Sequence, residues 1–107
     1  MNLIYQMQAD YLKALAHPTR LRILELLRDQ DELCVCHIIE DLALDQSNTS
    51  QHLRVLKKAG IVTSNKVGLK VFYKPVSKDV YNLIDLLRPL LAKQVQSITA
   101  VLESEEL

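Results

Sequence analysis

The chain has 107 residues, 49% of them hydrophobic, and its 13 Lys and Arg balance 13 Asp and Glu. This length corresponds to one domain with a small core, over residues 1–107, and no stretch approaches the roughly 18 consecutive apolar residues of a membrane span. The N-terminal residues lack the charged and apolar regions of a secretion signal, so we expect a cytoplasmic protein without membrane contact.

The balanced charge conceals a strong separation of basic and acidic residues along the chain. The 33 residues from Gln46 to Lys78 include no acid and seven bases, which are Arg54, Lys57, Lys58, Lys66, Lys70, Lys74 and Lys78. All 13 acidic residues therefore lie in the flanks. An acid-free basic segment indicates a surface for an anionic partner such as a nucleic acid, the alternative being a solvated face.

The spacing of apolar residues predicts three helices in the first part of the chain. We expect them over residues 3–16, over Thr19–Arg28 after a break at Pro18, and over Cys36–Leu42, where Ile38, Ile39 and Leu42 are buried. Thr19 is the expected N-cap of the second helix. The short stretch 33–36, at the start of the third helix, is rich in strand-forming types.

A fourth helix is expected over Gln46–Ala59, after a turn at Ala43 and Leu44. Asp45 is a good N-cap for it, and Gly60 suits the position that follows its C-cap. Three residues at helical spacing form its inward stripe, which consists of Thr49, Leu53 and Leu56.

The pattern then changes to a basic β-hairpin followed by a long final helix. Strands over 61–65 and 70–74 flank a connection in which Gly68 permits the turn. The last helix is expected over residues 78–102, with Pro89 either bending it or beginning a new turn. The resulting fold class is mainly α with a small hairpin wing, a winged helix-turn-helix.

The fourth helix has the composition of an element that reads the major groove of duplex DNA. Short uncharged groups at its N-terminal end can approach base edges, and the residues proposed for this role are Gln46, Ser47, Asn48, Ser50 and Gln51. Basic residues are expected to meet the phosphate backbone, namely Arg54, Lys57 and Lys58 on later turns and Lys66 and Lys70 on the wing. Each residue alone would also fit a solvated surface, so the collective pattern carries the prediction.

Four stretches together resemble the ArsR/SmtB family of metal-sensing transcriptional repressors. They are residues 15–24 (LAHPTRLRIL), 32–36 (ELCVC), 45–53 (DQSNTSQHL) and 58–62 (KAGIV). The resemblance implies a homodimer held by the first and last helices. It also implies a protein that is bound to its operator without inducer and leaves the DNA when an inducer binds.

The resemblance also implies that Cys34 and Cys36 correspond to thiolates of the family's cysteine metal box. Some arsenic-sensing members have a further cysteine where this chain has Ile39. Cadmium- and lead-sensing members add cysteines from an N-terminal arm, and this chain has no cysteine before Cys34. The last helix also lacks the His and carboxylate pattern of zinc-sensing members, so zinc control through that helix is not expected.

Residues two apart share a face only in an extended segment, so Cys34 and Cys36 can cooperate if residues 33–35 are extended and Cys36 begins the third helix. The helix N-terminus should then lower the pKa of the Cys36 thiol. Two thiolates suit trivalent arsenic or antimony, Cd or Pb. A third ligand is missing, for which the adjacent His37, water or a small thiol are candidates. Oxidation or persulfidation of the pair and a pair without sensory role remain alternatives.

A ligand that pulls the two cysteines together is expected to shift the first turn of the third helix and thereby move the fourth. Three other classes of protein remain open at this point. They are a small thiol oxidoreductase, a metal carrier, and a winged helix that binds protein instead of DNA. The oxidoreductase would ordinarily use CxxC on a βαβ frame, and a carrier leaves the basic segment unexplained.

Overall fold

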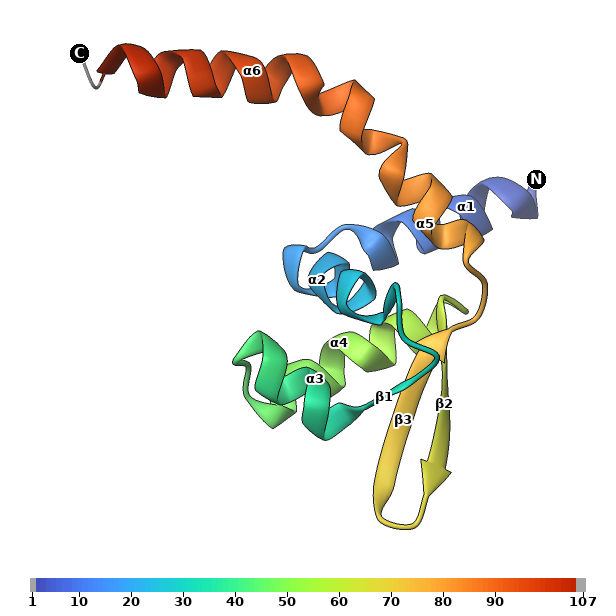
Figure 1. The fold of residues 1–107 in the computed structure, drawn as a ribbon. Helices are drawn as coiled ribbons and strands as arrows, with labels where there is room; N and C mark the ends of the chain where they lie inside the picture. Colours follow the sequence, from blue (N-terminus) through green and yellow to red (C-terminus); the bar gives the residue numbers. More distant parts are fainter. Residues whose placement is uncertain (1, 106–107) are drawn as a thin grey trace.

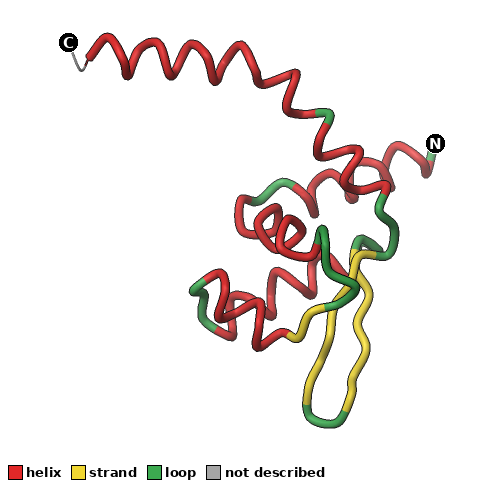
Figure 2. The backbone as a smooth tube through the Cα atoms, viewed as in Figure 1, coloured by secondary structure: helices red, strands yellow, loops and turns green. Residues whose placement is uncertain are grey.

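The structure is a computed structural model that describes residues 2–105. Figure 2 shows a mainly helical chain with one small sheet. In chain order the elements are α1 (Leu3–Leu15), α2 (Pro18–Leu27), β1 (Leu33–Cys34), α3 (Val35–Leu42), α4 (Gln46–Lys58), β2 (Val62–Val67), β3 (Lys70–Pro75), α5 (Asp79–Asp85) and α6 (Leu87–Glu105). The β2–β3 hairpin and α6 project in opposite directions from a core built on α2, α3 and α4 (Figure 1). The predicted winged helix-turn-helix is confirmed.

The second helix begins earlier than expected, at Pro18. Its N-cap is His17, whose Nδ1 accepts a hydrogen bond from the backbone N–H of Thr19 at 3.1 Å. The prediction of Thr19 as the N-cap was therefore wrong. Proline fits the first helical position because its fixed φ already matches the helix and its missing N–H would have no partner there.

The core is formed by residues from both sides of the turn between α3 and α4. Thr49, Leu53 and Leu56 are each 0% exposed, which confirms the predicted inward stripe of α4. In α3, Ile38 is fully buried, whereas Ile39 and Leu42 are half-buried. These stripes pack on the fully buried Ile23, Leu24 and Leu27 of α2, so packing against α2 fixes the orientation of α4.

The wing is a three-stranded antiparallel sheet in the order β1-β3-β2. The predicted hairpin is confirmed, with a first strand that runs two residues closer to the tip than expected, as Val67 pairs with Lys70. Gly68 has φ +62° and opens the two-residue connection, a position where a glycine avoids the strain of positive φ. The next side chain, Leu69, is 99% exposed.

The last helix is not continuous, because the chain leaves α5 at Asp85 and resumes as α6 at Leu87. Proline in a helix interior removes one backbone hydrogen bond and its ring clashes with the carbonyl four residues earlier, which for Pro89 belongs to Asp85. The single helix expected over 78–102 is therefore two helices, α5 and α6, and Pro89 lies in the first turn of α6.

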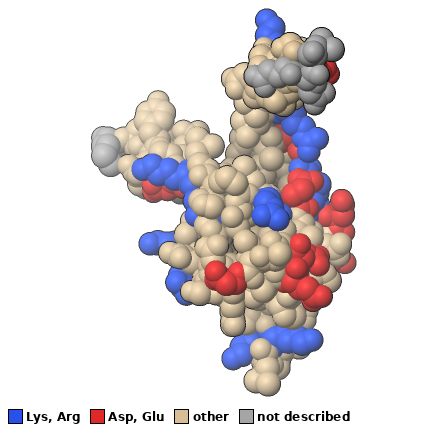
Figure 3. All heavy atoms as spheres, turned by 90° about the vertical axis from the view of Figure 1, so that its left-hand side faces the viewer, with Lys and Arg blue, Asp and Glu red and all other residues tan. Residues whose placement is uncertain are grey.

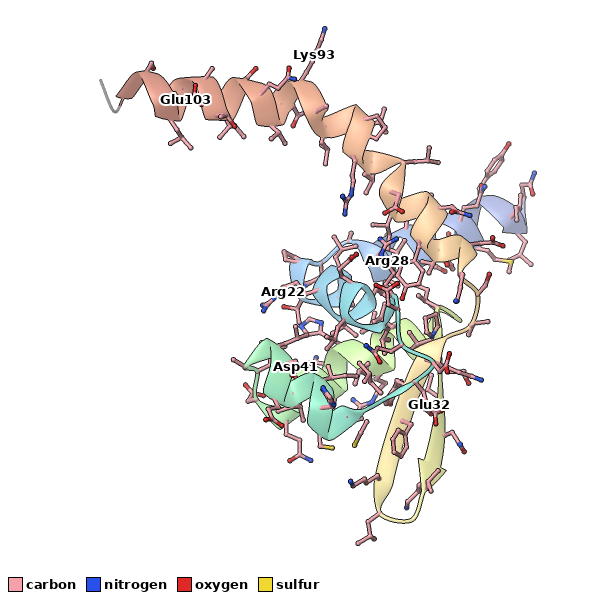
Figure 4. The ribbon with its side chains drawn as sticks, in the orientation of Figure 1. Arg22, Arg28, Glu32, Asp41, Lys93 and Glu103 are labelled. Atoms are coloured by element: carbon pink, nitrogen blue, oxygen red, sulfur yellow. The ribbon has the colours of Figure 1, made fainter. Side chains whose placement is uncertain are left out.

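Arg28 fastens α5 to α2, between which it lies in Figure 4. Its guanidinium donates two hydrogen bonds to the Asp85 carboxylate, at 3.0 and 2.8 Å, and lies over the Tyr81 ring. The buried Tyr81 hydroxyl donates to the carbonyl of Leu24 at 2.7 Å. The position of α5 is thus fixed up to the point where α6 leaves the body.

Apolar side chains remain exposed along the first and last helices. On α1 they are Leu3, Ile4, Met7 and Leu12, and on α6 they are Leu87, Leu90, Leu91, Val95, Ile98, Val101 and Leu102. Exposed apolar faces of this extent are typical of surfaces that pack on another chain. None of the helices within residues 2–105 has both the length and the hydropathy that crossing a bilayer requires.

Candidate nucleic-acid interface and thiol pair

The N-terminal end of α4 is exposed and rigidly capped. Asp45 caps the helix by accepting a hydrogen bond from the backbone N–H of Asn48 through Oδ1, at 2.6 Å. The Thr49 hydroxyl donates to the carbonyl of Asp45 at 2.9 Å. Ala43 adopts a left-handed φ of 53° in the preceding turn, which ends α3 and redirects the chain. The expected cap and turn are both confirmed.

The polar residues proposed to read bases lie on the outer face of this end of α4. Those that are exposed are Gln46, Ser47, Asn48 and Gln51, whereas Ser50 is half-buried. Because the opposite stripe is fully buried, these side chains are held outward on a helix that cannot rotate without opening the core. Their hydrogen-bonding groups are free to meet a partner in solution.

The basic residues proposed for phosphate contact extend from α4 to the wing. All five are exposed, namely Arg54, Lys57, Lys58, Lys66 and Lys70. Figure 3 shows basic side chains across the wing at the lower end of the molecule and acidic ones on the body above it. The separation of charge along the sequence is therefore retained in space.

The structure adds two details that the spacing of these residues did not indicate. Lys57 Nζ donates to the hydroxyl of Ser64 on β2 at 2.6 Å, which links the end of α4 to the wing. Lys66 is paired with Val71 and Lys70 with Val67, so the two wing lysines belong to opposite faces of the hairpin. A ligand beside the wing thus meets them from different directions.

His52 lies on the inner side of α4 and is only 8% exposed, so it is packed in the domain and is not available to a base edge. Its ring is 4.4 Å from that of His17, centroid to centroid, and its Nδ1 lies 3.3 Å from Arg20 Nη1. Arg20 can only donate, so His52 Nδ1 accepts and the ring is neutral. Burial, His17 and Arg20 lower the pKa of His52. Sequence reasoning missed this cluster because its members are far apart along the chain.

We predict that the domain loses stability below neutral pH through His52. Its folded-state pKa is lowered, so the unfolded chain takes up a proton first, and stability present above about pH 6.5 falls as the pH drops toward the folded-state value. The measurement is the free energy of unfolding in urea at about pH 7.5 and about pH 5.5. The His52→Gln variant should show a smaller pH dependence, whereas an equal dependence would contradict the assignment. His37→Gln, at an exposed position, is the matched control.

Cys34 and Cys36 lie where β1 passes into α3. Cys34 is the N-cap of α3, and its Sγ accepts a hydrogen bond from the backbone N–H of Cys36 at 3.3 Å. Cys34 is half-buried and Cys36 is exposed. The extended segment is shorter than expected, because Val35 already belongs to the helix, but the cap geometry still brings the two thiols together.

The two thiols differ in acidity, in the opposite sense to the sequence prediction. A hydrogen bond from the Cys36 side chain, the backbone N–H groups of Cys36 and His37, and Lys70 lower the pKa of Cys34. Donating that bond to Cys34, together with burial and the adjacent charge, raises the pKa of Cys36. The expected lowering at Cys36 was wrong because the cap residue, and not the second helical residue, faces the free N–H groups.

The thiol pair offers two sulfur donors, and no third protein ligand lies beside them in the described part of the chain. Among residues 2–105, no three or more His, Cys, Asp or Glu side chains gather in a way that could hold a metal. The Nε2 of His37 instead lies 3.1 Å from Oδ2 of Asp41 on the outer surface of α3. The two thiols fit part of the coordination of trivalent arsenic, and the remainder would come from solvent or an exogenous thiol.

Comparison with known proteins relates most of the chain to bacterial regulators. A model of bacterial regulatory proteins of the arsR family matches residues 17–64. The uncharacterised helix-turn-helix-type transcriptional regulator Rv0081 of Mycobacterium tuberculosis is 38% identical over 100 residues, 94% of this chain and 88% of that protein. The cadmium resistance transcriptional regulatory protein CadC of Listeria innocua is 40% identical over 78 residues, 73% of this chain and 66% of that protein.

Solved structures agree with these relatives. The crystal structure of Rv0081 superposes with a TM-score of 0.77 at 34% identity, covering 92% of this chain and 99% of that one. The solution structure of the homodimeric winged helix-turn-helix DNA-binding domain Mb0332 of Mycobacterium bovis has a TM-score of 0.76 at 28% identity, covering 89% and 87%. Both similarities extend beyond the wing to the flanking helices, because the shares covered exceed the matched family region.

Proposed function

Because the chain belongs to the ArsR/SmtB family of winged helix-turn-helix transcriptional regulators, we propose that it is a cytoplasmic repressor that releases its operator when a soft metal ion or metalloid binds Cys34 and Cys36. Trivalent arsenic or antimony is the proposed inducer. The whole chain, residues 1–107, acts as one DNA-binding and dimerisation unit. DNA binding without enzymatic activity is the general property of the family.

The exposed polar end of α4 beside a basic wing is the observation that carries the DNA-binding proposal. In a winged helix, the N-terminal end of the second helix of the motif enters the major groove, and here it is capped and held by the core. Gln46, Ser47, Asn48, Ser50 and Gln51 are the proposed base readers. Arg54, Lys57, Lys66 and Lys70 are the proposed phosphate contacts.

The direct test is a titration of fluorescent duplex from the promoter of the protein's own gene. With thiols reduced and metals chelated, the protein should bind the duplex, and its affinity should fall steeply as the salt concentration rises. The reason is that Lys and Arg side chains displace cations from the DNA phosphates, and added salt opposes the release of those cations. If no duplex shows salt-dependent affinity, the proposal fails. A random duplex at the same salt concentrations gives the non-specific reference.

We predict that substituting a base reader and substituting a phosphate contact affect DNA binding in different ways. Gln51→Ala should relax preference for one base pair, by about 1–3 kcal/mol, because it removes hydrogen bonds to a base edge. Lys66→Ala should weaken binding to all duplexes alike and reduce the slope of log affinity against log salt by about 1. Affinities for an operator and its single-pair variants at several salt concentrations measure both effects. The prediction fails if the two variants have the same profile.

The exposed apolar faces of α1 and α6 support a homodimer formed by the first and last helices. The homodimeric domain Mb0332 superposes over 89% of this chain, a share large enough to reach into both helices. The helix α5 is packed on the core, whereas α6 extends away from it. The apolar side chains of α6 are therefore exposed and can contact a second copy of the chain. Dimerisation would present two copies of α4 to two operator half-sites about one helical turn apart.

The acidity of Cys34 beside Cys36 supports a thiol-directed inducer. A thiolate with a neighbouring thiol is the donor pair that soft ions select, and the relative CadC is a cadmium resistance regulator. The same exposed pair favours a second candidate, control by oxidation or persulfidation of the thiols. Titrating the DNA-bound protein with arsenite, antimonite, Cd²⁺, Pb²⁺, Zn²⁺ and peroxide separates the candidates, since only the true inducer releases DNA at low concentration.

A further inference from the structure

The thiol pair lies at the root of the wing. Strand β1 pairs with β3 only at Leu33 with Tyr73 and at Cys34 with Phe72, whereas β3 continues toward the tip through Val71 and Lys70 with β2 alone. The edge of β3 beyond Cys34 is therefore not covered by a strand. Lys70 on this edge lines the same groove as Cys34.

A groove of about 550 Å³ begins at this edge and reaches α4. Its walls combine the two thiols with residues of the reading helix and of the wing, including Gln46, Ser50 and Lys70. These three residues are among the proposed DNA contacts. Val71 and Tyr73 of β3 and Ile39 of α3 supply apolar surface. The ligand position and the DNA-reading surface are thus two parts of one groove.

We propose that the ligand held by Cys34 and Cys36 and the operator duplex exclude each other directly, because both need this groove within the same protomer. The inference rests on the proposed function and concerns how the same site is regulated. It differs from a signal passed through a shift of α3 to the partner subunit. No movement of the dimer interface is needed for release.

The way in which a duplex would dock on α4 and the wing explains why the two ligands exclude each other. A duplex that receives the end of α4 in its groove and the wing on its backbone spans the space between Ser50 and Lys70, which is the space that Cys36 faces from the root of the wing. Filling that space with a liganded ion and its remaining donors removes the room for a phosphate beside Lys70. Conversely, bound DNA covers the approach to the exposed thiol of Cys36.

The first test measures how fast iodoacetamide alkylates the cysteines with and without operator duplex, in the absence of any metal. Mass action predicts that free duplex at about 100 times its Kd slows alkylation about 100-fold if only unbound protein reacts. The chain has only two cysteines, so mass spectrometry reads each one directly. The control is Asp29→Cys in a Cys34→Ser, Cys36→Ser background. Asp29 is exposed and close to Tyr81 of α5, away from the wing, so its rate should not change.

The second test follows operator affinity as arsenite is raised to saturation of the thiols. Direct exclusion predicts that the apparent Kd for DNA keeps rising in proportion to arsenite, with no ternary complex. Coupling between separate sites instead gives a plateau, at about 5- to 150-fold weaker binding. Unchanged alkylation on bound DNA, or such a plateau, would overturn the inference while leaving repression by thiol ligands intact. Absence of duplex binding, or of arsenite binding to the thiols, would overturn the proposed function itself.

Discussion

The Cys34→Ser variant should bind operator DNA as tightly as the unaltered protein and should no longer release it when arsenite is added. Serine is among the best N-cap residues, so its hydroxyl can accept the hydrogen bond that Cys36 N–H now donates to the Cys34 sulfur. The fold of α3 and the position of α4 should therefore be retained. What is lost is the thiol with the lowered pKa, and with it one of the two proposed soft ligands.

Fluorescence anisotropy of a labelled operator measures this result in one titration. The unaltered protein should lose at least about 5-fold in apparent affinity at saturating arsenite, and Cys34→Ser should lose none. Cys36→Ser should also fail to respond, because a single remaining thiol cannot chelate. Normal release by both serine variants would refute the assignment of the inducer to this pair.

Leu53→Ala should strongly destabilise the domain through the helix α4. Leu53 is fully buried between α4 and the α2–α3 core, so truncation removes apolar contacts and leaves a cavity, at a cost of about 2–5 kcal/mol. The total stability of a domain of this kind is only about 5–15 kcal/mol. We therefore expect a large drop in the urea midpoint, and at physiological temperature part of the population should be unfolded and unable to bind DNA.

The adjacent exposed residue provides the matched control. Arg54→Ala removes a charge from the outer face of the same helix, so the unfolding free energy should change by less than about 0.5 kcal/mol while DNA binding weakens at low salt. Urea denaturation should therefore distinguish Leu53→Ala from the unaltered protein but not Arg54→Ala, whereas duplex titration at low salt should show weaker binding by folded Arg54→Ala. If Leu53→Ala leaves the midpoint unchanged, the packing of α4 on α2 is not as described.

Much of the candidate interface could be predicted because its signals are local. The cap at Asp45, the stripe of Thr49, Leu53 and Leu56, and Gly60 after the helix each depend on residues within about four positions, where helical geometry alone fixes which side chains share a face. The hairpin was likewise predictable from Gly68 and alternating strand residues. In each of these cases the structure has the expected element, with bounds shifted by one or two residues.

Where prediction failed, neighbouring elements or finer cap geometry decided the outcome. The start of α2 depended on His17 acting as the cap before Pro18, and the break at Leu86 depended on the clash between Pro89 and the carbonyl of Asp85. The relative acidity of the cysteines depended on which of them occupies the cap position. The helix starts one residue earlier than expected, which makes Cys34 the cap residue. The free backbone N–H groups of the first turn point at the cap side chain, so it is the cap thiol whose pKa they lower.

The order of residues by itself determined the winged helix-turn-helix, the exposed reading end of α4 and the segregation of basic charge, because these follow from short-range periodicity and composition. Only the tertiary structure decided that His52 is enclosed by His17 and Arg20, that Lys57 is fastened to the wing, and that the thiol pair opens into the groove between α4 and β3. These relations join residues that are distant along the chain. Their distances are set by how the sheet and helices pack, which no local pattern encodes.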